Sequence, residues 1–361
     1  MTLITAILVC LSGLCIVATL LPLLPIAHGA VRSFDFARLQ VIGIATLVLI
    51  AAALLPIPQT AMIVLAAMTV TTLAIQMVYV LPFTPVWFTQ TARYAGDLEK
   101  AEVISFFVSN VKQGNRDYAR VADLLAERDP DIAIFMETDQ AWFEALRPSL
   151  SKFKHIAACP QSNTYGMILA SRLPLRSYDV QFLLNEEVPS ISCIATLPGG
   201  QDVRIVAIHP EPPLPTRDTL GRDAEILLVG EMASEEPLPT IVTGDLNDVA
   251  WSRTTRRFLR LSRLLDPRQG RGFFNSFDAR RWYMRWPLDH IFHSVRFELV
   301  DMERLPFIGS DHFPMFYRFA LTDADNNQPP PPGTKADLKE ADDVVATEKH
   351  RNRPPVGTDW E

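Results

Sequence analysis

The chain has 361 residues, of which 48% are hydrophobic and 21% are charged, and its formal net charge at pH 7 is −7. This acidic balance argues against a dedicated nucleic-acid binder, because such proteins need an excess of positive charge to face the phosphates. The N-terminal quarter holds almost no charge, which argues against an ordinary soluble protein along the whole length.

Residues 1–88 contain three apolar stretches, at about 3–24, 39–57 and 61–81. Each is close to the roughly 20 residues that a helix needs to span a bilayer. A cleaved signal peptide is the weaker interpretation of the first stretch, because no Lys or Arg precedes it and two more stretches follow. Buried core helices would show a polar face, which these stretches lack. We therefore expect three transmembrane helices, with the lipid bilayer as their partner.

Basic residues near these stretches bear on which side of the membrane the rest of the chain faces. With three crossings, Arg32 and Arg38 lie on the side of the later residues, and the positive-inside rule places that side in the cytoplasm. Large domains can cross regardless of such charges, and in an oxidising compartment Cys159 and Cys193 could form a disulfide. Buried free thiols are the favoured interpretation of these cysteines. We expect a multi-pass protein of a bacterial inner membrane, with the side left open.

A linker at 89–100 leads to a segment, 101–321, that is long enough for one domain with a large core. Short apolar runs bounded by turn residues predict strands at 103–108, 132–136, 166–170, 191–196, 203–208, 241–243, 288–292 and 315–319. Helical spacing of apolar residues predicts helices at 116–125, 216–233 and 253–264. This order indicates an α+β sandwich with helices outside.

The last segment, 322–361, differs in composition from the domain. It begins with polar residues and four consecutive prolines, Pro329 to Pro332, and continues with mixed charges and few large apolar residues. Such a composition cannot bury enough apolar surface to order the chain. We expect a disordered tail.

Polar side chains follow several of the predicted strands. Asp245 and Asn247 come after 241–243, Glu137 directly follows 132–136, and Asp311 with His312 follows another apolar run. A lone Asp-x-Asn after a strand commonly forms only a turn, but three such endings together predict a metal cluster. Hard oxygen donors suit Mg²⁺ or Mn²⁺ rather than zinc. The combination predicts metal-assisted hydrolysis of a phosphoester.

Seven stretches, in order, resemble the endonuclease/exonuclease/phosphatase superfamily, which has the deoxyribonuclease I-like fold. They are 109–111, 130–137, 166–175, 208–210, 243–247, 287–290 and 309–314. The resemblance implies two packed sheets, a two-sheet β-sandwich flanked by helices, whose upper edges hold the site.

The resemblance also implies a role for each matching residue around the cation. Glu137 would be the principal metal ligand, with Asn110 and Asp311 close to the ion. Asp245 would orient or deprotonate the attacking water, and Asn247 would hold that water or a phosphate oxygen.

Three further residues carry roles from the resemblance. His312 would bind the scissile phosphate, and Asp289 would steady His312 and favour its charged form. His209 matches the histidine that deoxyribonuclease I-like and sphingomyelinase-like members place near the leaving group, where AP endonucleases tend to have Asn. This difference argues against repair of AP sites.

Ten arginines and six aromatic residues lie between Trp251 and Trp286. Three interpretations stay open: contacts to nucleic-acid phosphates and bases, docking onto anionic lipid headgroups, and a solvated helix face followed by a packed loop. We expect a membrane-anchored, metal-dependent phosphodiesterase or phosphatase, with nuclease activity ahead of phospholipid or inositol-phosphate hydrolysis. A non-enzymatic membrane interaction module is the alternative of another class, and no protein partner is predicted.

Overall fold

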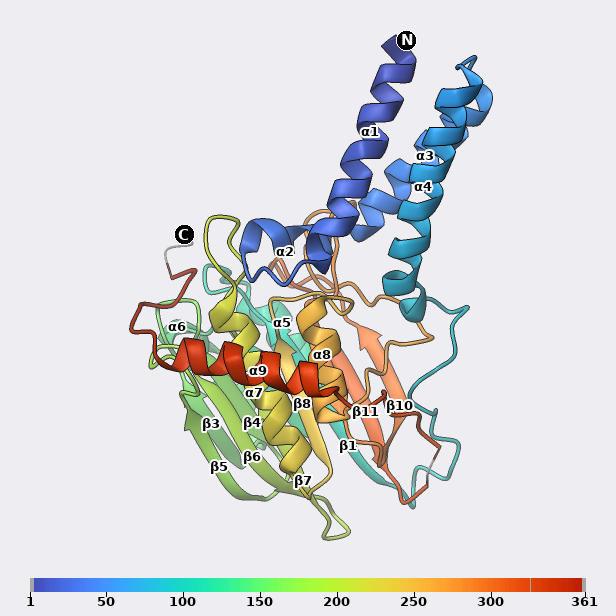
Figure 1. Ribbon diagram of the computed structural model, residues 1–361. Helices are drawn as coiled ribbons and strands as arrows, with labels where there is room; N and C mark the ends of the chain where they lie inside the picture. Colours follow the sequence, from blue (N-terminus) through green and yellow to red (C-terminus); the bar gives the residue numbers. More distant parts are fainter. Residues whose placement is uncertain (1–2, 325, 359–361) are drawn as a thin grey trace.

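The computed structural model describes residues 3–324 and 326–358. Two β-sheets pack face to face, helices cover their outer faces, and the N-terminal helices project from one end of the sandwich (Figure 1). The predicted α+β sandwich is confirmed. Outside the strands, the helices are α1 (Leu3–Leu20), α2 (Gly29–Phe36), α3 (Arg38–Leu54), α4 (Gln59–Val80), α5 (Tyr118–Arg128), α6 (Gln140–Leu146), α7 (Leu220–Glu235), α8 (Arg253–Ser262) and α9 (Lys335–Lys349).

One sheet has six strands in the order β10-β11-β1-β2-β4-β3, and the other has five in the order β5-β6-β7-β8-β9. The strands are β1 (Glu102–Asn110), β2 (Ile132–Met136), β3 (His155–Cys159), β4 (Met167–Ser171), β5 (Leu175–Gln181), β6 (Ser190–Thr196), β7 (Asp202–Ala207), β8 (Thr240–Asp245), β9 (Asp289–His293), β10 (Phe297–Arg304) and β11 (Met315–Leu321). Sequence patterns missed β3, β5 and β10. These strands alternate or expose polar residues, so their apolar signal is weak.

The central strands are continuous apolar runs in the sequence because one face of each packs against the other sheet and the opposite face packs against helices. In β1, Phe106 and Val108 join the core between the sheets, whereas Phe107 packs beneath α5 and α6. Alternate residues of a strand point to opposite faces, so a strand buried on both faces needs apolar residues throughout.

Strand direction brings the predicted site residues to one edge. β1 and β2 are parallel, as are β7 and β8, so their carboxyl ends meet at that edge. β11 is antiparallel to β1, and β9 is antiparallel to β8, so both begin there. The chain therefore carries polar residues to the same edge at the ends of some strands and at the beginnings of others.

The N-terminal helices have apolar outer faces. α1 and α4, each with a short continuation, are long and apolar enough to span a membrane, and α2 with α3 would make a third span only as a pair bent by 64°. The predicted stretches thus correspond to helices, but α3 alone has 17 residues.

A buried polar network joins these helices at their base. Arg38 pairs with Asp35 at 2.6 Å, donates to Gln76 at 2.9 Å and lies over the ring of Tyr79, while Gln76 donates to Thr19. Arg38 therefore neutralises a neighbouring carboxylate inside the protein and does not face lipid headgroups. This use weakens the charge argument for the side of the membrane.

α2 is seated directly on the domain. The amide of Gly29 donates to Arg217 at 2.8 Å, and a Cβ at Gly29 would come within 1.8 Å of the Leu214 oxygen. The indoles of Trp251 and Trp286 donate to the carbonyls of Asp35 and Phe36. These contacts hold the apolar helices in a defined position above the sandwich.

The tail does not match the prediction of disorder, because it contains α9, which packs along α7 and α8 (Figure 1). Thr334 and Asp337 form a capping box at its start, and Ala341 and Val345 are buried against α7. Arg257 and other residues of α8 supply countercharges for the acids of α9. Ion pairs with α8 and apolar contacts with α7 together hold this polar helix in place.

The expected linker at 89–100 is held against the domain by backbone hydrogen bonds. The amide of Tyr94 donates to the carbonyl of Leu299 at 2.9 Å, so this segment lies along β10. Cys159 and Cys193 are free thiols, as favoured from the sequence.

We expect Asp337→Asn to loosen α9. Asp337 accepts from Arg260 at 2.6 Å and caps the helix through Thr334, so its loss should cost about 1–2 kcal/mol of local stability. Hydrogen exchange of the α9 amides should accelerate by roughly 5–30-fold. Asp343→Asn, an exposed position on the same helix, is the matched control. Unchanged exchange in Asp337→Asn would show that the ion pairs do not hold the helix.

Candidate active site

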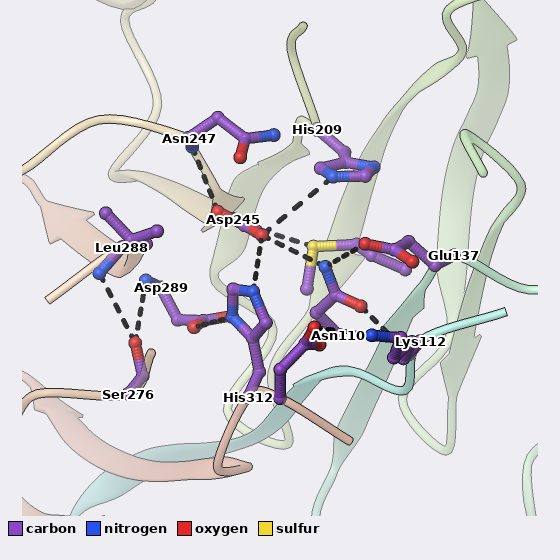
Figure 2. Close-up of polar contacts among 12 residues, drawn as sticks. Asn110, Lys112, Glu137, His209, Asp245, Asn247, Ser276, Leu288, Asp289 and His312 are labelled. Carbon is purple, nitrogen blue, oxygen red and sulfur yellow. Dashed lines mark hydrogen bonds and ion pairs between the residues drawn. The ribbon is translucent and has the colours of Figure 1, made fainter. Parts of the chain in front are cut away.

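The polar strand ends enclose a cavity of about 240 Å³. Its lining includes Glu137, His209, Asp245, Asn247, Asp311 and His312. Asn110 and Asp289 lie buried directly behind this lining and bond to it. The structure therefore brings together all eight residues selected from the sequence, and Figure 2 shows Asp245 at their centre.

Asn110 links two acids from different sheets. Its side-chain nitrogen donates to Glu137 at 2.7 Å and to Asp245 at 3.0 Å. Burial raises the pKa of Glu137, although the bond from Asn110 opposes this, and burial with the nearby Asp289 raises the pKa of Asp245. Both carboxylates are thus poorly compensated in their charged forms.

His312 lies between two acids. Its Nδ1 is 2.7 Å from Asp289, and its Nε2 is 3.4 Å from Asp245. Burial disfavours the imidazolium, but Asp289 and Asp245 outweigh burial and raise the pKa of His312 well above its usual value. His312 is therefore a fixed cation, and Ser276 holds the backbone of Asp289 behind it.

His209 has the opposite electrostatic character. Burial lowers its pKa to about 3, and the charged His312 adds to the effect. Its Nε2 lies 3.9 Å from Asp245, and its ring packs beside Tyr165. A neutral imidazole here can donate a hydrogen bond from one ring nitrogen and accept one at the other.

Asp311 has two basic partners that sequence reasoning missed. Lys112 lies 2.7 Å and Arg280 lies 3.0 Å from the same carboxylate oxygen. Burial opposes the ionisation of Asp311, but His312 and Lys112 outweigh it and hold its pKa below the usual range. Lys112 sits two residues after Asn110 at a strand end, which is the one sequence signal that could have identified it.

Other walls of the cavity come from segments that the sequence analysis did not assign to the site. Phe36 of α2 and Phe277 line it, as does Gly357 of the C-terminal segment. This last segment is fixed by Arg353, which forms a bidentate pair with Glu211. Both ends of the chain therefore shape the site.

The backbone is constrained where the acids leave their strands. Glu137 and Asn247 have positive φ angles of 57° and 51°, which few non-glycine residues adopt. Gly244 has φ of 141°, and a Cβ there would lie 1.9 Å from the oxygen of Ile208. Only glycine allows β8 to approach the segment that carries His209.

The donor set fits a divalent cation bound by oxygen. Asp245, Asp289 and His312 offer atoms within 4.8 Å of one another and could hold an ion, although the neighbouring acids raise the pKa of His312, which favours its protonated form over a ligand. Within residues 3–324 and 326–358, Asp289 Oδ1 has no hydrogen-bond partner. Asp311 already has Lys112 and Arg280, so Glu137 is the acid whose charge most needs a cation.

Most arginines between 251 and 271 are used inside the protein. Arg257 and Arg260 pair with Asp337, Arg253 pairs with Glu340, and Arg268 pairs with Asp266. The expected solvated helix face is therefore not found at Arg257 and Arg260, because α9 covers this side of α8 and supplies their carboxylate partners. Arg280 and Arg281 remain about half exposed near the site.

The chain was compared with known proteins. A search of curated sequences gave no significant match. Among solved structures, D. rerio TDP2 complexed with single-strand DNA product aligns with a TM-score of 0.51 and 17% identity, over 60% of this chain and 98% of that chain. A humanized D. rerio TDP2 gives 0.51 and 17%, over 61% and 99%. The human Nocturnin catalytic domain with bound sulfate gives 0.50 and 16%, over 62% and 96%.

At these identities the likenesses concern the fold. The family model described as the endonuclease/exonuclease/phosphatase family matches residues 107–312, which is more than half of the chain. That range contains all eight predicted site residues. The chain belongs to the endonuclease/exonuclease/phosphatase family.

Proposed function

We propose that this protein is a membrane-anchored hydrolase of phosphoester bonds that requires Mg²⁺ or Mn²⁺. The observation that carries the proposal is the meeting of Glu137, Asp245 and Asp289 with a charged His312 around one cavity. Apolar outer faces on α1 and α4 support the anchoring.

Glu137 is the proposed principal ligand, with Asn110 and Asp311 beside it. A bound divalent cation would polarise the phosphoester and stabilise the charge that develops on its oxygens. The oxygen donors and the raised pKa of Glu137 support this assignment.

The remaining residues would act on water and phosphate. Asp245 accepts the proton of the attacking water, and Asn247, whose amide nitrogen is held by Pro210 at 2.9 Å, presents its oxygen to that water. His312 donates to a phosphate oxygen, with Asp289 orienting its ring and favouring its charged form. His209 lies on the other side of Asp245, where its neutral ring would donate a hydrogen bond to the leaving oxygen.

Two substrate classes follow from different observations. D. rerio TDP2 complexed with single-strand DNA product supports a nuclease-like activity. The apolar helices seated beside the cavity support a phospholipid or inositol-phosphate substrate. Turnover of the purified protein on DNA, RNA, phospholipid and inositol phosphates, with Mg²⁺ and with chelator, tests both. Absence of metal-dependent turnover on every substrate would contradict the proposed function.

A non-enzymatic interaction module would have no need for this cluster. Buried carboxylates destabilise a fold unless they are compensated, so a scaffold would gain stability by losing them. If Asp245→Ala preserved full cellular function, the module would be favoured over the enzyme.

We expect Glu137→Gln to lower cation affinity by about 10–100-fold and to abolish activity at low Mg²⁺. Because the change removes a buried charge, the metal-free variant should melt higher than the metal-free wild type. Thermal melting at a series of Mg²⁺ concentrations measures both effects. Glu144→Gln, an exposed position on α6, is the control. If the melting temperature of the variant depended on Mg²⁺ concentration as that of the wild type does, Glu137 would not be a cation ligand.

We expect His209→Ala to reduce kcat by about 10²–10³-fold with little change in cation affinity. We expect Asp311→Ala and Glu137→Ala instead to lower the affinity of the site for the cation. Steady-state kinetics across Mg²⁺ concentrations separate these effects. Equal loss of cation affinity in all three variants would show that the roles are wrongly assigned.

A further inference from the structure

A second cavity, of about 560 Å³, adjoins the candidate active site. Its lining is mostly apolar and includes Ser33, Phe36, Ala37, Pro213, Met284 and Trp286. Phe36 and Pro213 line both cavities, so the two spaces meet at these side chains. We call this second cavity the apolar groove. Its size is within the range of about 300–1,000 Å³ for ligand sites.

The apolar groove lies where the membrane helices join the domain. One wall is α2 and the turn into α3, and the other is the loop 279–286. The helices α1, α3 and α4 leave the sandwich at this same end (Figure 1). In the proposed membrane-anchored protein, a hydrocarbon chain of the bilayer would therefore have a short path to the groove.

The loop 279–286 has the composition of a membrane-interface segment. Trp282 is 81% exposed and Tyr283 is 59% exposed, and Arg280 and Arg281 stand beside them. Exposed aromatic rings are favoured at headgroup depth, and arginines there attract anionic headgroups. This loop also supplies Met284 and Trp286 to the groove.

The active-site cavity has a charged lining and the apolar groove an uncharged one, which matches the charged headgroup and the hydrocarbon chain of a lipid. The active-site cavity holds acids together with Lys112 and His312, which suit a phosphate and its cation. The apolar groove offers no charged side chain among the residues that line it. A polynucleotide would need basic residues continuing away from the phosphate site, and in the described structure the arginines at 253–268 are paired internally.

We propose that the substrate is a lipid-linked phosphoester, with its phosphate in the active-site cavity and its hydrocarbon chain in the apolar groove. This inference rests on the proposed function and specifies its substrate class. Phe36 and Pro213 would contact the lipid where the headgroup meets the chain.

The test uses the full chain in vesicles and measures hydrolysis of three substrates. Two are phosphatidylglycerols, one with butanoyl and one with oleoyl chains, and the third is bis(p-nitrophenyl) phosphate, which has no lipid chain. Ser33→Trp fills the groove, and Ser234→Trp at the exposed end of α7 is the matched control. In both serines the hydroxyl donates at 2.7 Å to a backbone carbonyl of its own helix. We expect the ratio of oleoyl to butanoyl kcat/KM to fall at least about 10-fold in Ser33→Trp and not in Ser234→Trp.

Photocrosslinking gives a second measurement that does not depend on a variant. A phosphatidylglycerol with a diazirine in its acyl chain should label peptides containing 33–40 and 283–286. Labelling confined to the outer faces of α1, α3 and α4 would overturn the inference.

Failure of the inference differs from failure of the proposed function. Mg²⁺-dependent hydrolysis of bis(p-nitrophenyl) phosphate with equal loss on both lipids in Ser33→Trp would refute the lipid chain in the groove and leave the hydrolase intact. Faster cleavage of single-stranded DNA than of the oleoyl lipid would likewise refute it. No Mg²⁺-dependent turnover on any substrate would refute both.

Discussion

The burial of several carboxylates in one cavity is the constraint on which the site depends. Glu137, Asp245 and Asp289 come from different strands, and their mutual repulsion in a dry environment must be offset. The imidazolium of His312 and the amide of Asn110 supply part of that compensation. The remainder suits a divalent cation, and the strained backbone at Glu137 keeps its carboxylate facing the cavity. The cluster is thus more consistent with ion-assisted chemistry than with stability.

The N-terminal helices contribute to the candidate active site together with the sandwich. α2 is fixed by backbone hydrogen bonds and by two indoles, and its last residue, Phe36, lines the candidate active-site cavity. Such seating limits the directions from which a substrate can arrive. The buried pair of Arg38 with Asp35 maintains the geometry at the base of the helices, because breaking a buried pair leaves an uncompensated charge.

Much of the fold was predictable because its signals are local. Apolar runs ending in turn residues located β1, β2 and β8, and uncharged stretches located the N-terminal helices. The prediction failed for α9, whose partners lie far away in the chain: Arg257 of α8 is 80 positions earlier, and Ala341 and Val345 pack against α7. It also missed half-buried strands such as β5, where pairing with a neighbour replaces an apolar pattern.

The sequence by itself identified the eight polar residues of the candidate site, because they stand in ordered motifs whose order can be read without coordinates. Only the tertiary structure decided their electrostatic states, because these depend on distances between residues far apart in the chain. The pairing of Lys112 with Asp311 spans 199 positions, and the pKa of His312 is raised because Asp289 and Asp245 fold against it. The apolar groove also depends on tertiary structure, because its two walls, α2 and the loop 279–286, are about 250 positions apart in the chain and come together only in the folded protein.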